Sequence, residues 1–167
     1  MLYLLDANIL ITANNQYYPI DQVPEFWGWL QHQAMLGHVK IPYEIMDEIL
    51  AGHKKGDLLL DWIKEPANKE VLLLDETVDG DLVLKVSSEG YALNLTDDEI
   101  QVIGRDPFLI AYGLAREDRC VVTNEASSPG KKREKRKIPD VCDTMQVKWC
   151  GPFVFNRALG FSTNWKP

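Results

Sequence analysis

The chain has 167 residues, of which 46% are hydrophobic and 26% are charged, and its formal net charge is −7. This length and balance are typical of one globular domain, here residues 1–167, with a substantial core. No apolar run approaches the roughly 20 residues that a membrane-spanning helix needs. No basic region precedes the apolar start, so we expect a cytoplasmic protein with no signal peptide and no contact with a membrane.

Basic charge is concentrated in one short stretch, residues 131–137, which we call the basic segment. It carries six positive charges and one negative charge, net +5, so the remaining 160 residues carry −12 to give the total of −7. Turn-forming residues precede it, and we therefore expect residues 126–137 to form a loose basic loop. An acidic protein with one basic loop can still hold a polyanion locally.

The first half of the chain predicts a short buried strand followed mainly by helices. In chain order we expect a strand at residues 2–5, a loop at 14–24, a helix at 25–36, a short extended segment at 38–41, and helices at 43–51 and 57–63. Pro42 favours a helix start, because its missing N–H is not needed in the first turn. Gly37 and Gly52 are typical helix ends.

The second half continues the alternation of strands and helices. In chain order we expect a strand at 71–74, a helix at 77–92, a short helix from a capping box at 96–99 to about 104, a helix at 108–116, a strand at 119–123 and an extended segment at 147–150. Strands that alternate with helices favour a mainly parallel sheet covered on both faces. We therefore expect an α/β fold, a three-layer α/β/α sandwich.

Four acidic residues stand where this fold would bring them together. Two follow predicted strands and two lie on or just before predicted helices: Asp6, Glu125, Glu48 and Asp106. In open parallel sheets, sites form just beyond the carboxyl ends of the strands. A cluster of carboxylates is the ligand set that a hard divalent cation needs. The pattern therefore indicates metal-assisted phosphodiester chemistry.

Each of these acids also has a purely structural interpretation. Asp6 could be a polar end to a strand, and Asp106 precedes a proline, as a helix N-cap often does. On the helix at 43–51, Glu44 points away from the apolar side and is expected in solvent, whereas Glu48 flanks that side. Asp47 flanks that side as well, so helix geometry leaves both acids open, and a solvated helix-face acid is the alternative to a site role for Glu48.

Five segments of the chain resemble a known family. They are Tyr3-Leu4-Leu5-Asp6-Ala7-Asn8, the stretch from Ile41-Pro42 to Glu48-Ile49-Leu50-Ala51-Gly52, and residues 106–112, 121–125 and 137–142. In this order they are similar to the PIN domain, a metal-dependent nuclease fold. Residues 15–27 resemble the PIN-like subfamily DUF4411, whose members look like toxins of toxin–antitoxin pairs.

The resemblance implies catalytic and metal-binding roles for the four acids. Together they would hold one or two Mg²⁺ or Mn²⁺ ions, partly through water: Asp6, Glu48, Asp106 and Glu125. Supporting polar groups would come from Asn8, Thr123 and Asn124. Glu125 departs from the aspartate that the family usually has there, so Asp140 is an alternative last ligand, with Asp143 behind it. An N-cap role is an equal alternative for Asp140.

The resemblance further implies an endoribonuclease that hydrolyses RNA phosphodiester bonds and acts as a toxin. Its partners would be an RNA substrate, a cognate antitoxin protein, with a helix-turn-helix regulator as one candidate, and in some members a second copy. The basic segment would clamp the RNA backbone through Lys131, Lys132, Arg133, Lys135, Arg136 and Lys137. A solvated loop is the simpler interpretation of these six cations.

Two other functions compete with this one. The first is a catalytically inactive PIN-fold module that binds RNA or protein, and the retained acids disfavour it. The second is a phosphatase with Asp6 as nucleophile, which would want a second aspartate two residues on, where Asn8 stands.

Overall fold

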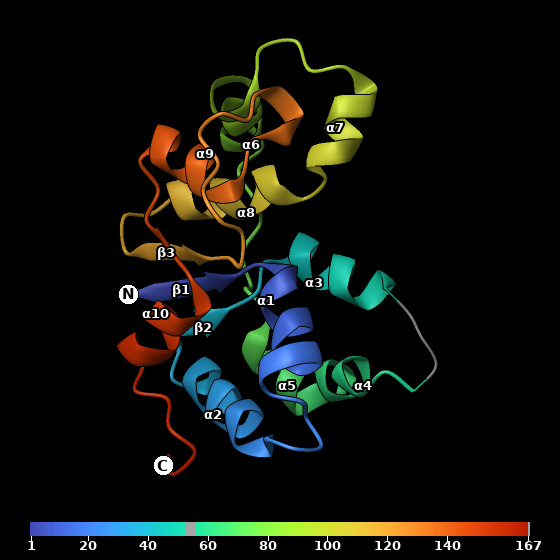
Figure 1. The fold of residues 1–167 in the computed structure, drawn as a ribbon, viewed down its shortest axis with the longest axis vertical. Helices are drawn as coiled ribbons and strands as arrows, with labels where there is room; N and C mark the ends of the chain where they lie inside the picture. The colour runs from blue at the N-terminus through green and yellow to red at the C-terminus, as the bar shows by residue number, and fades with distance from the viewer. Residues whose placement is uncertain (53–55, 167) are drawn as a thin grey trace.

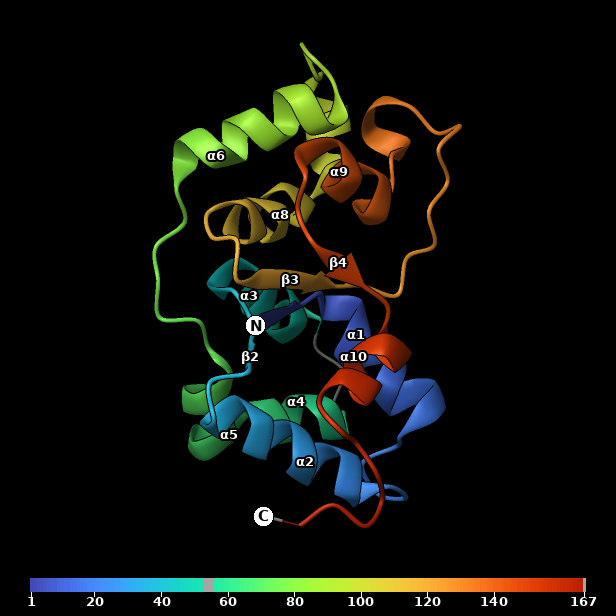
Figure 2. The same cartoon turned by 90° about the vertical axis from the view of Figure 1, so that its left-hand side faces the viewer.

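The centre of the fold is a parallel sheet that lies between helical layers (Figure 1, Figure 2). The computed structural model describes residues 1–52 and 56–166. The strand order is β2-β1-β3-β4, with β1 at Leu2–Leu5, β2 at Val39–Lys40, β3 at Arg119–Val122 and β4 at Trp149–Cys150. All three neighbouring pairs of this sheet are parallel. The predicted three-layer α/β/α sandwich is confirmed.

The helices fall into two layers about this sheet. Their bounds, in chain order, are α1 Ala7–Thr12, α2 Pro24–Met35, α3 Tyr43–Ala51, α4 Leu58–Lys64, α5 Pro66–Leu72, α6 Gly80–Lys85, α7 Asp97–Ile103, α8 Asp106–Leu114, α9 Ile138–Met145 and α10 Pro152–Ala158. Helices α8 and α9 lie on one side, with α6 and α7 beyond them, and α2 and α10 lie on the other (Figure 1, Figure 2). None of the helices in the part of the chain that the structure describes has both the length and the hydropathy that a bilayer crossing requires.

Aromatic packing fixes one face of the sheet. Trp29 of α2 and Phe155 of α10 are almost fully buried, and their ring centroids lie 5.6 Å apart. Phe155 also meets Tyr3 of β1 edge to face at 5.2 Å. Such pairs add to the stabilisation that comes from burying the rings. The contacts hold the central strand β1, and therefore the residue that follows it, in one position.

Close backbone packing fixes the opposite face. Gly113 lies on α8, and a methyl group there would come within 2.7 Å of Val147 Cγ1 and 3.1 Å of Val121 Cγ2. Because glycine has no side chain, α8 can lie close against β3. This close approach places the start of α8 near the end of β3, where two of the predicted site acids stand.

Several predicted elements differ from the structure. The strand expected at 71–74 is wrong: α5 runs to Leu72, and only Leu73 pairs with Ile41, in an isolated bridge. A short apolar run does not distinguish a buried strand from a buried helix end. The loop expected at 14–24 instead begins with a π-helical turn, η1 (Ala13–Tyr17).

The segment expected to form one helix at 77–92 forms a shorter α-helix that continues as a π-helical turn. It begins at Gly80, because the side chain of Asp79 caps it by accepting from the backbone N–H groups of Asp81 and Leu82. From Val86 to Tyr91 it continues as a second π-helical turn, η2. Glu44 also differs from expectation, since its side chain is partly buried rather than solvated.

A buried arginine fastens the connection between α5 and α6 to the sheet. Arg119, at the start of β3, is 2% exposed. Its Nη2 donates to both carboxylate oxygens of Glu76, at 2.6 and 2.5 Å, and its Nη1 donates to the carbonyl oxygen of Tyr112 at 2.9 Å. The hydroxyl of Tyr112 in turn donates to the carbonyl oxygen of Glu76 at 3.0 Å.

We expect Arg119→Met to lower the free energy of unfolding by about 2 kcal/mol, because charge-assisted hydrogen bonds are lost while Glu76 stays partly in water. Urea denaturation measures this loss. Arg116→Met is the matched control, since its ion pair with Asp118 is exposed and should contribute no more than about 0.5 kcal/mol. Equal losses in the two variants would contradict a structural role for the Arg119 contacts.

Candidate functional site

The candidate site begins where β1 and β3 end. Asp6 follows β1 directly and is 4% exposed. Its backbone N–H donates to the carbonyl oxygen of Val122 at 3.0 Å, and Thr123 Oγ1 donates to Asp6 Oδ2 at 3.0 Å. Within the sheet, β2 lies on one side of β1 and β3 lies on the other side. Asp6 therefore stands at the point where strand order reverses, as ligand sites in such sheets do.

A second, half-buried acid lies at the start of α8. Asp106 is the first residue of α8, ahead of Pro107, and not its N-cap, a position that Arg105 holds. Its Oδ2 accepts a hydrogen bond from the hydroxyl of Tyr91, at 3.3 Å. Tyr91 is buried and ends the turn η2. Sequence analysis missed Tyr91, because nothing in its sequence neighbourhood links it to an acid fifteen residues later.

Electrostatics shows that all four predicted acids share one environment. The pKa of Asp106 is raised to about 8, mainly by burial and also by the negative charges of Asp6, Glu125 and Glu48. Burial also raises the pKa of Asp6 to about 6, with contributions from Glu48 and Glu125. The pKa of Glu48 is raised by burial and lowered by Arg105. The four acids therefore lie near enough for their charges to interact.

Glu125 differs from the other three acids, because both of its oxygens are already bound. Its Oε1 accepts from Lys137 Nζ at 2.6 Å, and its Oε2 accepts from the backbone N–H of Ile138 at 2.8 Å. Ile138 is the first residue of α9. The longer side chain of glutamate, in place of aspartate, allows Glu125 to span from the end of β3 to this helix.

The two alternative last ligands are also bound within the protein. Asp140 accepts from Ser127 Oγ at 2.6 Å and from the backbone N–H of Ser128 at 2.8 Å, one bond to each oxygen. It anchors the loop after β3 and does not cap α9. Asp143 accepts from Trp149 Nε1 at 2.7 Å. These contacts favour structural roles for Asp140 and Asp143.

The three supporting residues lie at the same edge of the sheet. Thr123 orients Asp6, and its Oγ1 also accepts from the backbone N–H of Glu125 at 3.1 Å. Asn124 Nδ2 donates to the carbonyl oxygen of Asn8 at 2.8 Å, which ties the end of β3 to the start of α1. The side chain of Asn8 itself is exposed.

The basic segment is not the loose loop that we expected. Residues 133–135 form a 3₁₀ turn, η3, and two arginines bind the protein itself. Arg133 donates to both carboxylate oxygens of Glu99, at 2.5 and 2.6 Å. Arg136 donates to the carbonyl oxygens of Gly90 and Asp140 and, at 2.7 Å, to Thr144 Oγ1. Lys131, Lys132 and Lys135 are the exposed lysines of the basic segment, and Arg133 is exposed as well but is paired with Glu99.

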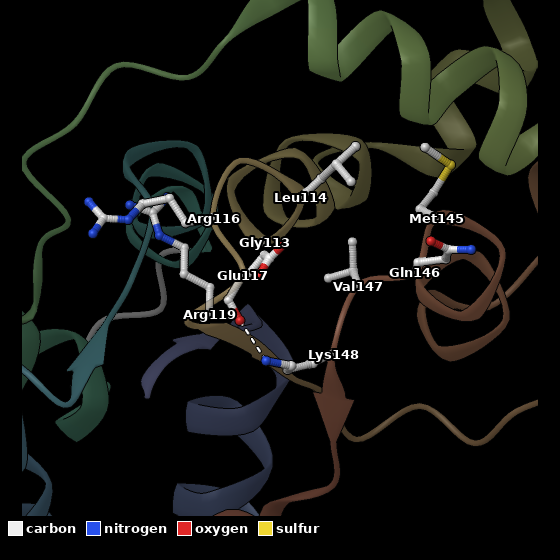
Figure 3. A pocket seen from close by; sticks show the side chains of 9 residues that line it. All are labelled: Gly113, Leu114, Arg116, Glu117, Arg119, Met145, Gln146, Val147 and Lys148. Carbon is white, nitrogen blue, oxygen red and sulfur yellow. Dashed lines mark hydrogen bonds between the residues drawn. The ribbon is translucent and has the colours of Figure 1, made fainter.

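A pocket of about 330 Å³ is lined by two of the four acids and by residues of the basic segment. Its lining residues are Val102, Asp106, Glu125, Lys131, Glu134, Lys135, Arg136 and Lys137. Another pocket, of about 360 Å³, lies at the amino-terminal ends of β3 and β4, where Lys148 Nζ donates to the carbonyl oxygen of Glu117 at 2.6 Å (Figure 3). The residues that line this second pocket include none of the candidate acids, so the first pocket is the one relevant to the site.

Carboxylate oxygens are the donor type that a hard divalent cation prefers. Asp6 and Asp106 each accept a bond from one neutral hydroxyl, and Glu48 is exposed at its edge of the cluster. The spacing is wider than a closed ligand set, because across residues 1–52 and 56–166 no three histidine, cysteine, aspartate or glutamate side chains group closely enough to hold an ion. An ion here would keep several water ligands, as Mg²⁺ commonly does.

The raised pKa values predict how the stability of the metal-free protein depends on pH. Between pH 3.8 and about 8, folded Asp106 retains a proton that the unfolded chain has lost. The free energy of unfolding should therefore fall as pH rises through this window. Urea denaturation at pH 5 and pH 8 should show a smaller fall for Asp106→Asn than for the wild type. Parallel curves would contradict the burial of a charged Asp106.

Comparison with known proteins places the chain in a family. A family model described as "Domain of unknown function (DUF4411)" matches residues 3–163. No curated protein and no solved structure matches the chain. Since the match covers nearly the whole sequence, the chain belongs to the DUF4411 family.

Proposed function

We propose that this protein is a Mg²⁺- or Mn²⁺-dependent endoribonuclease with a PIN-like fold. The main support is the position of three acids near the point where the strand order reverses. Asp6 follows β1, Glu48 lies on α3 and Asp106 begins α8. Asp6 is buried and Asp106 is half-buried, and burial, together with the charges of neighbouring carboxylates, raises the pKa of each. Functional sites are where such perturbed acids tend to cluster.

The metal ion and the protein side chains would have separate roles in the proposed reaction. A bound divalent ion would lower the pKa of a water and neutralise charge on the phosphate. Asp6, Glu48 and Asp106 would hold that ion, with Thr123 fixing the orientation of the Asp6 carboxylate and Tyr91 that of the Asp106 carboxylate. Catalytic sites need this kind of support, because small displacements of a ligand cost rate.

The pocket beside the acids suits a nucleic-acid backbone. Its wall carries Lys131 and Lys135, which are exposed, next to Asp106. Lysines in this position can bind phosphates on either side of the scissile bond without recognising bases. The proposed substrate is RNA, in line with the resemblance to PIN nucleases. A toxin role with a cognate antitoxin belongs to the same proposal, and a small regulator gene beside this one would support it.

Replacement of one proposed ligand tests the catalytic role. We expect Asp6→Asn to cleave a mixed RNA pool at least about a hundredfold more slowly than the wild type at saturating Mn²⁺, a loss typical of weakened metal sites. The control is Asp118→Asn, an exposed acid before β3, which should cleave at the wild-type rate. Folding of Asp6→Asn is checked by its melting temperature.

Two outcomes would overturn this proposal. Cleavage by Asp6→Asn at the wild-type rate would exclude Asp6 from the chemistry. A folded wild-type protein that binds RNA but cleaves it with neither Mg²⁺ nor Mn²⁺ would instead support an inactive binding module.

The exposed lysines of the basic segment give a separate test. Replacing Lys131, Lys132 and Lys135 with serine should weaken RNA binding for all sequences. Each lost phosphate contact on a single strand changes the slope of log affinity against log salt by about 0.7, so the triple variant should flatten it by roughly 2. The matched control changes three exposed lysines elsewhere, Lys64, Lys69 and Lys85. An equal effect in the two triple variants would mean that net charge alone governs binding.

A further inference from the structure

An apolar groove of about 360 Å³ lies between α6 on one side and α7 and α8 on the other. Its lining includes Val83 and Leu84 of α6, Ile100 and Ile103 of α7, and Phe108 of α8. Two of these side chains project into solvent, since Leu84 is 68% exposed and Ile100 is 51% exposed. Apolar side chains that are exposed together on the surface of a protein commonly mark a place where a partner binds.

The wall that α7 contributes is fixed before any partner arrives. Thr96 and Glu99 form a capping box that orders the first turn of this helix. Arg133 of the basic segment donates to both oxygens of Glu99 and, at 3.2 Å, to the carbonyl oxygen of Asn94. Ile103, at the end of the same helix, is buried. A groove whose walls are already ordered loses little conformational entropy when it binds a partner.

Acidic side chains flank both walls of the apolar groove. Asp81 stands three residues before Leu84 on α6, and Asp97 stands three residues before Ile100 on α7. Residues at this spacing are neighbours on the surface of a helix. Both acids are exposed, and within residues 1–52 and 56–166 neither has an ion-pair partner. Residues 79–105 include six acidic and two basic residues, a formal net charge of −4.

The sign of this charge separates the candidate occupants. The acids would repel phosphate groups, which disfavours RNA and the surface of an anionic membrane. A second copy of the chain is also a poor fit, because its concentrated cations stand at residues 131–137, where all seven side chains are charged and none is apolar. An apolar groove with acidic flanks instead suits an amphipathic helix that carries lysine or arginine beside its apolar face.

We propose that the apolar groove binds an amphipathic helix of another protein, whose apolar face contacts Leu84 and Ile100 and whose basic residues pair with Asp81 and Asp97. Helix α7 also carries Val102, which lines the pocket beside the candidate acids. The bound helix would therefore lie next to that pocket. This inference is independent of the proposed catalytic activity.

The test uses designed helical peptides that carry a fluorophore, and their binding to the full chain is followed by fluorescence anisotropy. One peptide has leucines spaced three and four residues apart with lysines beside them, and a second has glutamates in place of the lysines. We expect the lysine peptide to bind at least about tenfold more tightly than the glutamate peptide. Its affinity should also fall as the salt concentration rises.

Matched pairs of variants assign this binding to the groove. Replacing Asp81 and Asp97 together with asparagine should reduce the salt dependence, because the charges that attract the lysines are lost. The control replaces two exposed acids that lie elsewhere, Asp61 and Asp75, with asparagine and should leave the salt dependence unchanged.

A second set of variants removes the apolar contacts. Leu84→Gln and Ile100→Gln should each weaken the lysine peptide by about tenfold. Both side chains are exposed, so the variants should fold, and their melting temperatures check this. Met35→Gln, at an exposed apolar residue of α2, is the control and should leave the affinity unchanged.

Several outcomes would overturn the inference. They are equal affinity for the two peptides, an equal effect of the three glutamine variants, and no binding of the lysine peptide at millimolar concentration. A dimer of the free protein that Leu84→Gln dissociates would show instead that a second copy occupies the groove.

Discussion

The removal of two carboxylates from most of their water, at one edge of the sheet, is the constraint on which this structure depends. Asp6 and Asp106 come from elements a hundred residues apart, and both lie in surroundings that disfavour their charged forms. Burying an unpaired charge costs folding free energy. The packing of the aromatic layer beneath β1, and of α8 on β3, contributes the folding free energy that offsets this cost. A rigid scaffold can hold repelling acids together when its own packing is strong.

The sequence predicted the parts of the site that follow directly from strand ends. Asp6 and Glu125 come after apolar runs, and parallel strands bring their carboxyl ends to one edge of the sheet. The prediction that these two acids lie near each other therefore needed no further information. Asp106 was found for a similar reason, because an acid before proline marks a helix start. In each case a local signal determined where the side chain would lie.

The contacts that the sequence did not predict depend on tertiary packing. Tyr91 reaches Asp106 only because a π-helical turn and α8 pack together. The basic segment looked loose by composition, yet Arg133 and Arg136 bind groups that lie 34 and 46 residues earlier in the chain. Both oxygens of Glu125 are bound by the residues that open α9. Periodicity and turn propensity carry no information about such partners, since these describe only neighbours along the chain.

The π-helical turn η2 has a consequence for the direction in which Tyr91 points. In an α-helix each residue turns the chain by about 100°, so one added residue changes the direction of every later side chain. The wider i to i+5 spacing of η2 absorbs such a residue without ending the helix. This change of phase turns the side chain of Tyr91 inward, toward Asp106. The contact between Tyr91 and Asp106 therefore depends on the helical phase of residues 86–91 as well as on the tyrosine itself.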